Sequence, residues 1–283
     1  MPEGHTLFRL ARTLDDHFAG RTVSVSSPQG RFAAAASLLD GSRLEAAESY
    51  GKHLFIEFEE ERCIHVHLGL YGKFVVRTGV PSPPVGQVRL RLVAEPGPDR
   101  APAYGDLRGA TACELMTDED RVLLLDRLGP DPLRSDADWT RAWDRVSRSR
   151  APIGGLLMDQ SVLAGVGNVY RAEVLFRHRL DPLRPGRTLR RGVFEQLWHD
   201  LVVLMADGVR RGRIDTVHVP SDEAVVGRVP TAATHGSPVF VYRRQGQACF
   251  VCGSTVRTEV LAGRNLFWCP RCQPRFRSRA RAA

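Results

Sequence analysis

Four cysteines near the end of the sequence constrain its fold more than any other feature. Cys249 and Cys252 form one Cys-x-x-Cys pair, and Cys269 and Cys272 form a second pair after sixteen intervening residues. Two such pairs at this separation supply four thiolates for one tetrahedral zinc ion in a closed, structural site. The alternative is a disulfide or redox site, which is rare in a cytoplasmic chain. A structural zinc contributes on the order of 10 kcal/mol to folding, enough to stabilise a segment too small to fold alone.

The segment between the two cysteine pairs predicts a β-hairpin. Its residues, TVRTEVLAGRNLFWC, alternate between apolar and polar side chains, with Gly263 and Arg264 expected at the tip. From Arg264 onward there are six arginines and no acidic residue. A zinc ribbon that presents an exposed arginine suits contact with a phosphate backbone. For the last of these arginines, the alternative is a disordered tail.

The composition favours a soluble protein that binds a polyanion. The 283 residues are enough for two domains, and 43% of them are hydrophobic. A formal net charge of +8 points to nucleic acid as the commonest partner of such a chain. No apolar run reaches the roughly 20 residues that a membrane span needs, and the N-terminus lacks the apolar core of a signal peptide. We therefore expect a cytoplasmic protein that does not contact the membrane.

The first part of the chain predicts an antiparallel β sandwich or barrel with a helix beside it. Apolar residues at helical spacing indicate a helix from about residue 8 to 18, which Gly20 ends. Short alternating runs then follow, separated by Gly, Pro and Asp clusters. The runs cover residues 21–27, 42–50, 52–60, 63–72, 73–78, 87–95 and 110–116.

The remainder of the chain is predicted to be helical up to the zinc ribbon. Thr117 or Asp118 is a suitable cap for one linker helix, and the last long helix ends near Arg211. Residues 212–238 lack a clear period and predict an extended loop. The predicted parts are a β-sandwich domain, a linker, a helical domain with its loop, and a zinc finger with a basic tail, at residues 1–117, 118–137, 138–238 and 239–283.

A glycine-rich turn in the helical domain is a second candidate site. Leu156 and Leu157 indicate an apolar helix that runs into a Gly-Val-Gly turn, and Asn168 then stands where the next helix needs its N-cap. Glycines let a ligand approach the backbone closely, and the amides of a helix start suit a phosphate. The alternative is a helical hairpin without a ligand. The arginine-bearing ribbon favours the phosphate site.

The run CIHVHLGLYG carries two further groups of candidate residues. Period-two alternation places Cys63, His65 and His67 on one strand face, where the alternatives are a metal site and a satisfied strand surface. We favour the strand surface because a fourth ligand is not apparent. Leu70 and Tyr71 follow in a turn flanked by glycines, and are either a minor core cluster or an apolar wedge for a base stack.

Two features of the sequence point to functional amines: the rarity of lysine and the proline at position 2. Of 40 basic residues only Lys52 and Lys73 are lysines, and each follows a Tyr-Gly pair. Each lysine is either a solvated residue between a turn and a strand or an amine whose tunable pKa is needed. The chain begins with Met1, Pro2 and Glu3. Because methionine removal is favoured before a small residue, we expect Pro2 to become a free secondary amine.

With Pro2-Glu3, the Gly-Lys52 strand, the LAGVGN turn and the four-cysteine ribbon in this order, the chain resembles the formamidopyrimidine-DNA glycosylase and endonuclease VIII family. The resemblance covers nearly the whole chain. It implies an α+β protein with an N-terminal antiparallel β sandwich and flanking helix, a helix-two-turn-helix domain and a zinc-ribbon finger with four cysteine ligands. It also implies a monomeric, nucleoid-associated DNA glycosylase and AP lyase of base excision repair, which binds one Zn²⁺ and acts on DNA with oxidised bases or abasic sites.

The same resemblance implies roles for single residues. Pro2 is the expected Schiff-base nucleophile, which cleaves the strand by β,δ-elimination, and Glu3 is the acid that assists opening of the sugar. Lys52 matches the family's lysine on its β-hairpin. Asn168 matches the phosphate-binding asparagine, and Arg264 matches the zinc-finger arginine.

Some residues depart from the family pattern. Thr6 stands where most relatives carry a second glutamate. The stretch YGDLRGAT keeps Asp106 and Arg108, which is expected near the orphaned base, but lacks the phenylalanine of the formamidopyrimidine branch. The PEG start and the wedge of Leu70 and Tyr71 are more similar to endonuclease VIII, which acts mainly on oxidised pyrimidines.

Two other classes of protein remain as alternatives. A non-catalytic zinc-ribbon DNA-binding relative is favoured by one feature, Thr6 in place of a carboxylate. A structural zinc-ribbon protein of the ribosome leaves Pro2, Glu3 and the long N-terminal domain unexplained. The resemblance therefore favours the glycosylase.

Overall fold

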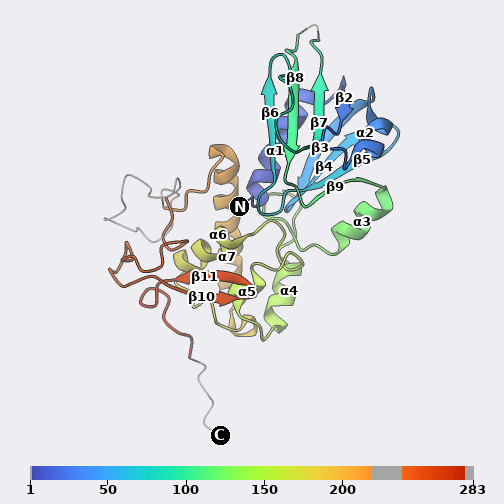
Figure 1. Cartoon of the computed structure of the whole chain (residues 1–283). Helices are drawn as coiled ribbons and strands as arrows, with labels where there is room; N and C mark the ends of the chain where they lie inside the picture. Colours follow the sequence, from blue (N-terminus) through green and yellow to red (C-terminus); the bar gives the residue numbers. More distant parts are fainter. Residues whose placement is uncertain (1, 98, 218–237, 278–283) are drawn as a thin grey trace. The chain divides into compact units, whose positions relative to one another are not determined.

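A computed structural model describes residues 2–97, 99–217 and 238–277. The chain divides into two units, Met1–Arg127 and Leu128–Ala283 (Figure 1). The first unit is mostly β-structure and the second mostly helical, which confirms the predicted α+β class. The boundary falls inside the predicted linker of residues 118–137. Within the described ranges, no helix is long and apolar enough to cross a membrane.

Two antiparallel sheets build the N-terminal unit (Figure 1). One sheet has the strand order β1 (Arg21–Thr22), β3 (Arg43–Tyr50), β4 (His53–Phe58), β5 (Arg62–His67) and β9 (Ala112–Met116). The other has the order β2 (Ser24–Ser26), β7 (Val88–Ala94), β8 (Ala103–Arg108) and β6 (Lys73–Thr78). Alternate residues of both sheets, among them Leu54 and Leu92, are fully buried in one shared core. The predicted β sandwich is therefore confirmed.

A helix at the N-terminus, α1 (Gly4–Phe18), closes one side of this core. Its apolar face, which includes Leu7 and Leu14, is buried, and the helix packs on β3 and β4. The predicted helix is confirmed, but it begins at Gly4, directly after Glu3. The core thus fixes the start of the chain.

Two elements of this unit were missing from the prediction. Helix α2 (Ala33–Leu39) buries only Ala36 and Leu39, so its sequence carries little amphipathic signal. Strand β8 contains Gly105 and Asp106, and both residue types are depleted in strands. Tertiary contacts explain both residues, because a Cβ at Gly105 would lie 2.9 Å from the Phe74 ring and Asp106 pairs with a buried arginine.

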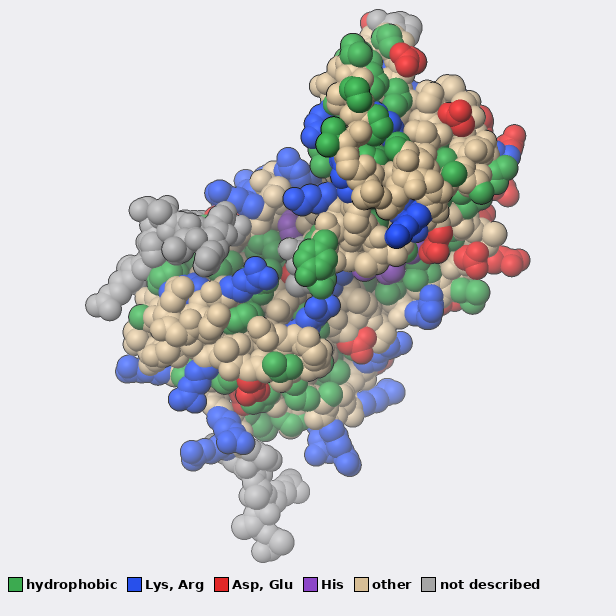
Figure 2. Space-filling model, in the orientation of Figure 1, with side chains coloured by type: hydrophobic (Ala, Val, Ile, Leu, Met, Phe, Trp, Pro, Cys, Tyr) green, Lys and Arg blue, Asp and Glu red, His purple; other side chains and the backbone are tan. Residues whose placement is uncertain are grey.

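Helix α3 (Asp118–Asp126) follows the last strand of this unit. Thr117 caps it, because its side chain accepts a hydrogen bond from the Asp120 backbone N–H at 3.1 Å. Of the two predicted caps, Thr117 is therefore correct. Acidic side chains stand out at the edge of this unit in the space-filling view (Figure 2), and the first turn of α3 is acidic at Asp118, Glu119 and Asp120.

Helices enclose a second core in the C-terminal unit. They are α4 (Thr140–Arg148), α5 (Ile153–Leu156), α6 (Asn168–Arg177), the 3-10 turn η1 (Gly186–Thr188) and α7 (Arg191–Arg211). The predicted apolar face of α7, which includes Phe194 and Leu201, is buried. Gly212, with φ of +68°, ends this helix in the left-handed conformation. Most of the predicted loop over residues 212–238 lies outside the described residues.

Candidate catalytic, DNA-binding and metal sites

The N-terminus combines a half-exposed proline with a fully buried glutamate. Pro2 is partly accessible, whereas Glu3 is 0% exposed and stands at the N-cap position of α1. The Thr6 N–H donates to the Glu3 carbonyl at 2.8 Å, which starts the helix. The positive end of the helix dipole favours a carboxylate at this place. Because α1 is anchored in the core, the backbone of Pro2 and Glu3 has a fixed position.

A neutral histidine lies directly behind these two residues. Burial, and then the positive charge of the N-terminus, lower the pKa of His5 to about 4. Its Nε2 lies 3.3 Å from the hydroxyl of Thr6. At neutral pH this region therefore carries an uncharged imidazole and a hydroxyl beside the buried Glu3.

Lys52 stands on the two-residue turn that joins β3 and β4. Tyr50 pairs with His53 across the turn, and Gly51 takes a left-handed φ of +59°. A glycine at the first central position suits a tight hairpin turn of this type. Lys52 itself is half-buried, and its charge is one of the causes that lower the pKa of His67, after burial and His65. The charge of Lys52 is therefore close enough to His67, at the end of β5, to act on it.

Leu70 and Tyr71 project from the turn between β5 and β6. Leu70 is 40% exposed and Tyr71 is 85% exposed, so they do not form a core cluster. The Gly72 N–H donates to the Leu68 carbonyl at 3.0 Å and closes the turn, and a Cβ at Gly69 would lie 2.4 Å from a Thr111 methyl group. A Cβ at Gly72 would lie 2.2 Å from a backbone carbonyl. Of the two alternatives, the exposure favours a wedge.

Arg108 lies at the end of β8 and is held by Asp106. Its Nη2 donates to Asp106 Oδ2 at 2.9 Å, and its Nε donates to the Val85 carbonyl at 2.9 Å. Arg91 binds both oxygens of the same carboxylate, at 2.7 and 3.0 Å. Burial opposes ionisation of Asp106, but the bonds and charges of Arg91 and Arg108 outweigh it and hold the pKa of Asp106 below its usual range. Asp106 thus orients Arg108.

The candidate metal group on β5 is a hydrogen-bonded strand face. His65 contacts His53 and Glu114, each at 2.9 Å, and His67 contacts the Thr111 hydroxyl at 2.8 Å. Burial raises the pKa of the Cys63 thiol to about 12, so it is not a ready thiolate ligand. Among the residues that the structure describes, no metal-ligating group includes these side chains. The predicted strand surface is confirmed.

Asn168 lies where α6 meets the zinc ribbon in the C-terminal unit. Its Nδ2 donates to the Asn265 carbonyl at 3.0 Å, and the fully buried Arg171 donates to the same carbonyl at 3.1 Å. Arg171 also donates to the side-chain oxygen of Asn168. These bonds link the start of α6 to the residue next to Arg264.

The predictions for the turn before α6 need two corrections. Gly167 occupies the N-cap position and Asn168 is the first helical residue, because the Asn168 side chain is bound to the ribbon instead of capping the helix. The predicted helix through Leu156 and Leu157 is a single turn that ends at Leu156. Residues 157–167 follow as turns and bends, with Gly165 at φ of +85°. Gly165, Val166 and Gly167 on this irregular path are buried.

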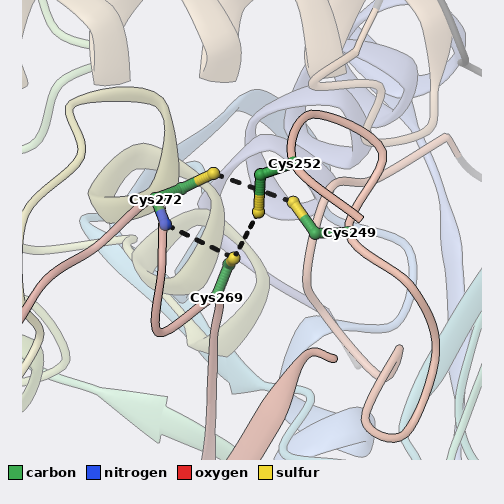
Figure 3. Close-up of side chains that lie close together, drawn as sticks. All are labelled: Cys249, Cys252, Cys269 and Cys272. Atoms are coloured by element: carbon green, nitrogen blue, oxygen red, sulfur yellow. Dashed lines mark hydrogen bonds between the residues drawn. The ribbon is translucent and has the colours of Figure 1, made fainter. Parts of the chain in front are cut away.

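The four cysteines of the ribbon converge from two loops (Figure 3). Their sulfur atoms all lie within 4.8 Å of one another, with Cys252 and Cys269 at 3.4 Å and Cys249 and Cys272 at 3.9 Å. Tetrahedral zinc with bonds of about 2.3 Å places thiolates roughly 3.8 Å apart. The Cys272 N–H also donates to Cys269 Sγ at 3.4 Å, as a bound thiolate requires. The site fits one structural zinc ion.

A short hairpin carries Arg264 in the ribbon. β10 (Arg257–Leu261) pairs antiparallel with β11 (Arg264–Trp268), and Leu261 is opposite Arg264. The tip is therefore Ala262-Gly263, one residue earlier than predicted, and both residues have positive φ, 51° and 70°. In a two-residue hairpin turn of this type both residues have a left-handed backbone conformation, because its twist matches the twist of the two flanking strands. Arg264 follows the tip and is exposed.

Comparisons with known proteins agree with this geometry. The formamidopyrimidine-DNA glycosylase N-terminal domain matches residues 1–113, its H2TH domain matches 128–219, and the zinc finger found in FPG and IleRS matches 246–275. The chain is 52% identical to Endonuclease 8 1 of Mycobacterium tuberculosis, over 96% of this chain and all of that protein. It is 33% identical to the formamidopyrimidine-DNA glycosylase of Stutzerimonas stutzeri, also over 96% of this chain and all of that protein.

A solved structure shares the fold. The Lactococcus lactis Fpg in complex with abasic-site DNA has a TM-score of 0.77 at 20% identity, over 96% of this chain and 100% of that one. Together with the sequence relatives, these matches show the class of protein. The chain belongs to the formamidopyrimidine-DNA glycosylase and endonuclease VIII family of DNA glycosylases with AP lyase activity, and its four cysteines bind one structural zinc.

Proposed function

We propose that this enzyme removes oxidised bases, mainly pyrimidines, from DNA and then cleaves the strand by β,δ-elimination through a Schiff base on Pro2. The observation that carries the proposal is the half-exposed Pro2 directly before the buried Glu3 at the start of α1. The similarity to Endonuclease 8 1 supports the pyrimidine preference. It also favours a catalytic protein over a non-catalytic DNA-binding relative. We expect a monomer that works on nucleoid DNA in the cytoplasm.

The chemistry follows from the secondary amine that removal of Met1 leaves on Pro2. The amine nitrogen attacks the anomeric carbon of the sugar while the bond to the base breaks. A secondary amine gives an iminium that stays charged at any pH, whereas a primary amine gives an imine that needs a proton. This cation withdraws electrons and acidifies the adjacent carbon. Elimination of the 3′ phosphate and then of the 5′ phosphate becomes possible.

Glu3 and the charge of the site prepare this attack. The carboxyl of Glu3 delivers a proton that opens the sugar ring as the amine adds. The Pro2 amine must be unprotonated to react, and a reference α-amino group has a pKa of about 8. The neutral state of His5 keeps a competing acid away from this position.

Phosphate binding positions the sugar for the attack. Lys52 offers an ammonium from the β3–β4 turn, and Asn168 and Arg264 offer an amide and a guanidinium from the C-terminal unit. Each group is fixed by its element, which limits the entropy lost when the substrate is oriented. Arg264 is presented by a zinc-stabilised hairpin, as suits a backbone contact without sequence specificity.

Access to the damaged base requires flipping it out of the duplex. Unstacking costs a few kcal/mol and is least costly at a lesion. The exposed Leu70 and Tyr71 are suited to fill the vacated space, since both are apolar and project from a turn closed by a hydrogen bond from the Gly72 N–H to the Leu68 carbonyl. We assign contact with the orphaned base to Arg108, whose guanidinium is oriented by Asp106.

Borohydride trapping tests this function. The wild-type protein with Met1 removed should form a covalent adduct with duplexes that contain an oxidised pyrimidine or an abasic site. Pro2→Gly should weaken or abolish the adduct. Equally strong trapping by a protein that retains Met1, as shown by intact mass, would contradict the role of Pro2.

A further inference from the structure

Two connections between the sheets of the N-terminal unit lie side by side. The wedge turn, residues 68–72, joins β5 in the five-stranded sheet to β6 in the four-stranded sheet. The β8–β9 loop, residues 109–111, joins the four-stranded sheet back to the five-stranded sheet. Because β5 pairs with β9 and β6 pairs with β8, both crossings occur at the same end of the sandwich.

Strand register fixes where the two connections begin and end. His67, the last residue of β5, is paired with Ala112, the first residue of β9. Lys73, the first residue of β6, is paired with Arg108, the last residue of β8. Directly opposed residues in an antiparallel pair have Cα atoms about 5 Å apart. The wedge turn and the β8–β9 loop therefore leave and re-enter the sheets at adjacent positions.

The same two connections carry the groups that are proposed to enter the duplex. Leu70 and Tyr71 project from the wedge turn, and Arg108 directly precedes the β8–β9 loop. The two backbones come close, since a Cβ at Gly109 would lie 3.4 Å from the Tyr71 carbonyl oxygen. The position of the turn relative to the loop therefore decides whether the three side chains fit one vacated space.

Thr111 joins the two connections through its side chain. Its hydroxyl donates to the His67 carbonyl at 2.9 Å, and the hydroxyl oxygen lies 2.8 Å from Nδ1 of the His67 ring. The backbone N–H of Thr111 also donates to the His67 carbonyl, at 2.9 Å. Three polar contacts thus link Thr111 to the residue from which the wedge turn starts.

Hydrogen-bond chemistry assigns a direction to each of these contacts. A carbonyl only accepts, so the single hydrogen of the Thr111 hydroxyl is used in its bond to the His67 carbonyl. The hydroxyl oxygen must then accept a bond from Nδ1 of His67, which carries a hydrogen. This arrangement holds for a neutral ring with its hydrogen on Nδ1 and for a protonated ring alike. The hydroxyl is therefore donor and acceptor at once, and a methyl group in its place could form neither bond.

The methyl group of Thr111 adds a steric contact with the wedge turn. A Cβ at Gly69 would lie 2.4 Å from this methyl carbon, so the methyl group occupies the space beside the Gly69 backbone. Gly69 has a φ of +66°, in the left-handed region that favours glycine. Both parts of the Thr111 side chain thus act on the wedge turn.

Arg89 of β7 anchors the loop that carries Thr111. Its Nη1 donates to the Ala110 carbonyl at 3.2 Å, and its Nη2 donates to the Cys113 carbonyl at 3.1 Å. These two carbonyls stand on either side of Thr111 in the chain. Thr111 therefore has a fixed base on the sandwich, and the wedge turn is the part that its side chain holds.

We propose that Thr111 is a positioning residue that locks the wedge turn to the β8–β9 loop, so that the wedge and Arg108 enter the duplex as one preformed unit. The proposal rests on the proposed roles of the wedge and Arg108 in base flipping. A preformed unit loses less conformational entropy on binding than two connections that are ordered separately. The Thr111 lock thus speeds insertion and has no part in the chemical steps at the sugar.

The first test measures insertion without catalysis. A duplex carries an uncleavable tetrahydrofuran analogue of the abasic site with 2-aminopurine opposite it, and stopped-flow fluorescence follows the loss of stacking of that base. Thr111→Val keeps the shape of the side chain and removes both of its hydrogen bonds, so the rate should fall by about fivefold or more. Thr111→Ser keeps the hydroxyl and should recover most of this rate. Thr78→Val, at an exposed position of β6, is the matched control and should equal the wild type.

Cleavage at a true abasic site separates insertion from a general loss of structure. No base has to be flipped in a single strand, so Thr111→Val should lower the ratio of duplex to single-strand cleavage rates, again by about fivefold. An unchanged fluorescence rate in Thr111→Val would overturn the proposal. Equal losses on the two substrates, or a Thr111→Ser rate as low as that of Thr111→Val, would overturn it too.

A double-mutant cycle tests whether the wedge and Arg108 act as one unit. Tyr71→Ala and Arg108→Ala are made singly and together, and their effects on the fluorescence rate are compared. The double variant should be less impaired than the product of the single effects, by about threefold or more, as coupled sites are. In the Thr111→Val background this coupling should disappear, and equal coupling in both backgrounds would contradict the lock. Absence of base removal and strand cleavage by the wild type would instead overturn the proposed function, and the fluorescence rates would still decide the role of Thr111.

Discussion

The two-sheet unit and the zinc ribbon hold their functional residues by different means. In the first, Glu3 and Lys52 stand on elements whose inner faces share one large apolar core. In the ribbon, β10 is exposed along nearly its whole length, and the buried residues gather around the cysteines. Burial of apolar surface stabilises the first unit, by about 25 cal/mol for each Å² removed from water. Metal binding stabilises the second.

This difference separates catalysis from DNA binding in physical terms. A change in the sandwich core should disturb the nucleophile and leave the zinc site intact. A change at the zinc should remove a phosphate contact and leave the N-terminal unit folded.

Loss of a zinc ligand should have the largest effect. Cys272→Ser removes one of four thiolates, and structural zinc sites contribute on the order of 10 kcal/mol, so the ribbon should unfold. DNA affinity should fall at least about tenfold as the Arg264 contact is lost. Metal content and fluorescence anisotropy with an abasic duplex would measure both effects. Unaltered affinity in a zinc-free protein would show that the ribbon does not bind DNA.

Replacement of the buried carboxyl should affect one chemical step. Glu3→Gln should slow removal of an oxidised pyrimidine by roughly 10²- to 10⁴-fold, because general acid catalysis is lost. Cleavage at an abasic site, where no base has to leave, should be less affected. Single-turnover rates on the two substrates give the ratio. Equal losses on both substrates would mean that Glu3 does not act on departure of the base, and Glu259→Gln on the exposed β10 is the matched control.

Truncation in the sandwich core should destabilise the first unit alone. Leu14→Ala on α1 removes a side chain that is 0% exposed, which should cost about 2–5 kcal/mol. Denaturant unfolding followed in the N-terminal unit by hydrogen exchange would measure it. Zinc content should stay at one ion per chain. A matching loss of zinc would show that the two units do not respond independently.

Removal of the wedge side chain should give the smallest effect. Tyr71 is 85% exposed, so Tyr71→Ala should leave stability unchanged. Loss of one aromatic stacking contact costs about 1–3 kcal/mol, which should appear in base removal from duplex DNA. An abasic site in a single strand needs no flipping, and its cleavage is the internal control. A larger effect on that control than on the duplex would contradict a wedge role.

The sequence predicted best what depends on local patterns. The cysteine spacing, the α1 periodicity and the Thr117 cap were all recognisable because neighbours in the chain determine them. β8 was missed because Gly105 and Asp106 are explained by Phe74 and Arg91, which are distant in sequence.

Contacts between residues distant in sequence also explain what the prediction of the candidate site missed. The position of Asn168 was off by one because its side chain binds the ribbon, almost a hundred residues later. The contacts of His65 with His53 and Glu114 were not predicted for the same reason, since the three residues come from three strands. Alternation showed that His65 and His67 share a face, but strand register decided their partners. Pair contacts of this kind have no signal in a single sequence.

Mapping the trapped adduct shows which amine of the protein attacks the sugar. The chain has only two lysines, so the amines that can form a Schiff base are the N-terminal amine, Lys52 and Lys73. After borohydride reduction on abasic-site DNA and proteolysis, mass spectrometry locates the sugar remnant. We predict that it lies on the nitrogen of Pro2 in a peptide without Met1. An adduct on Lys52 or Lys73, with Pro2 unmodified, would contradict the mechanism.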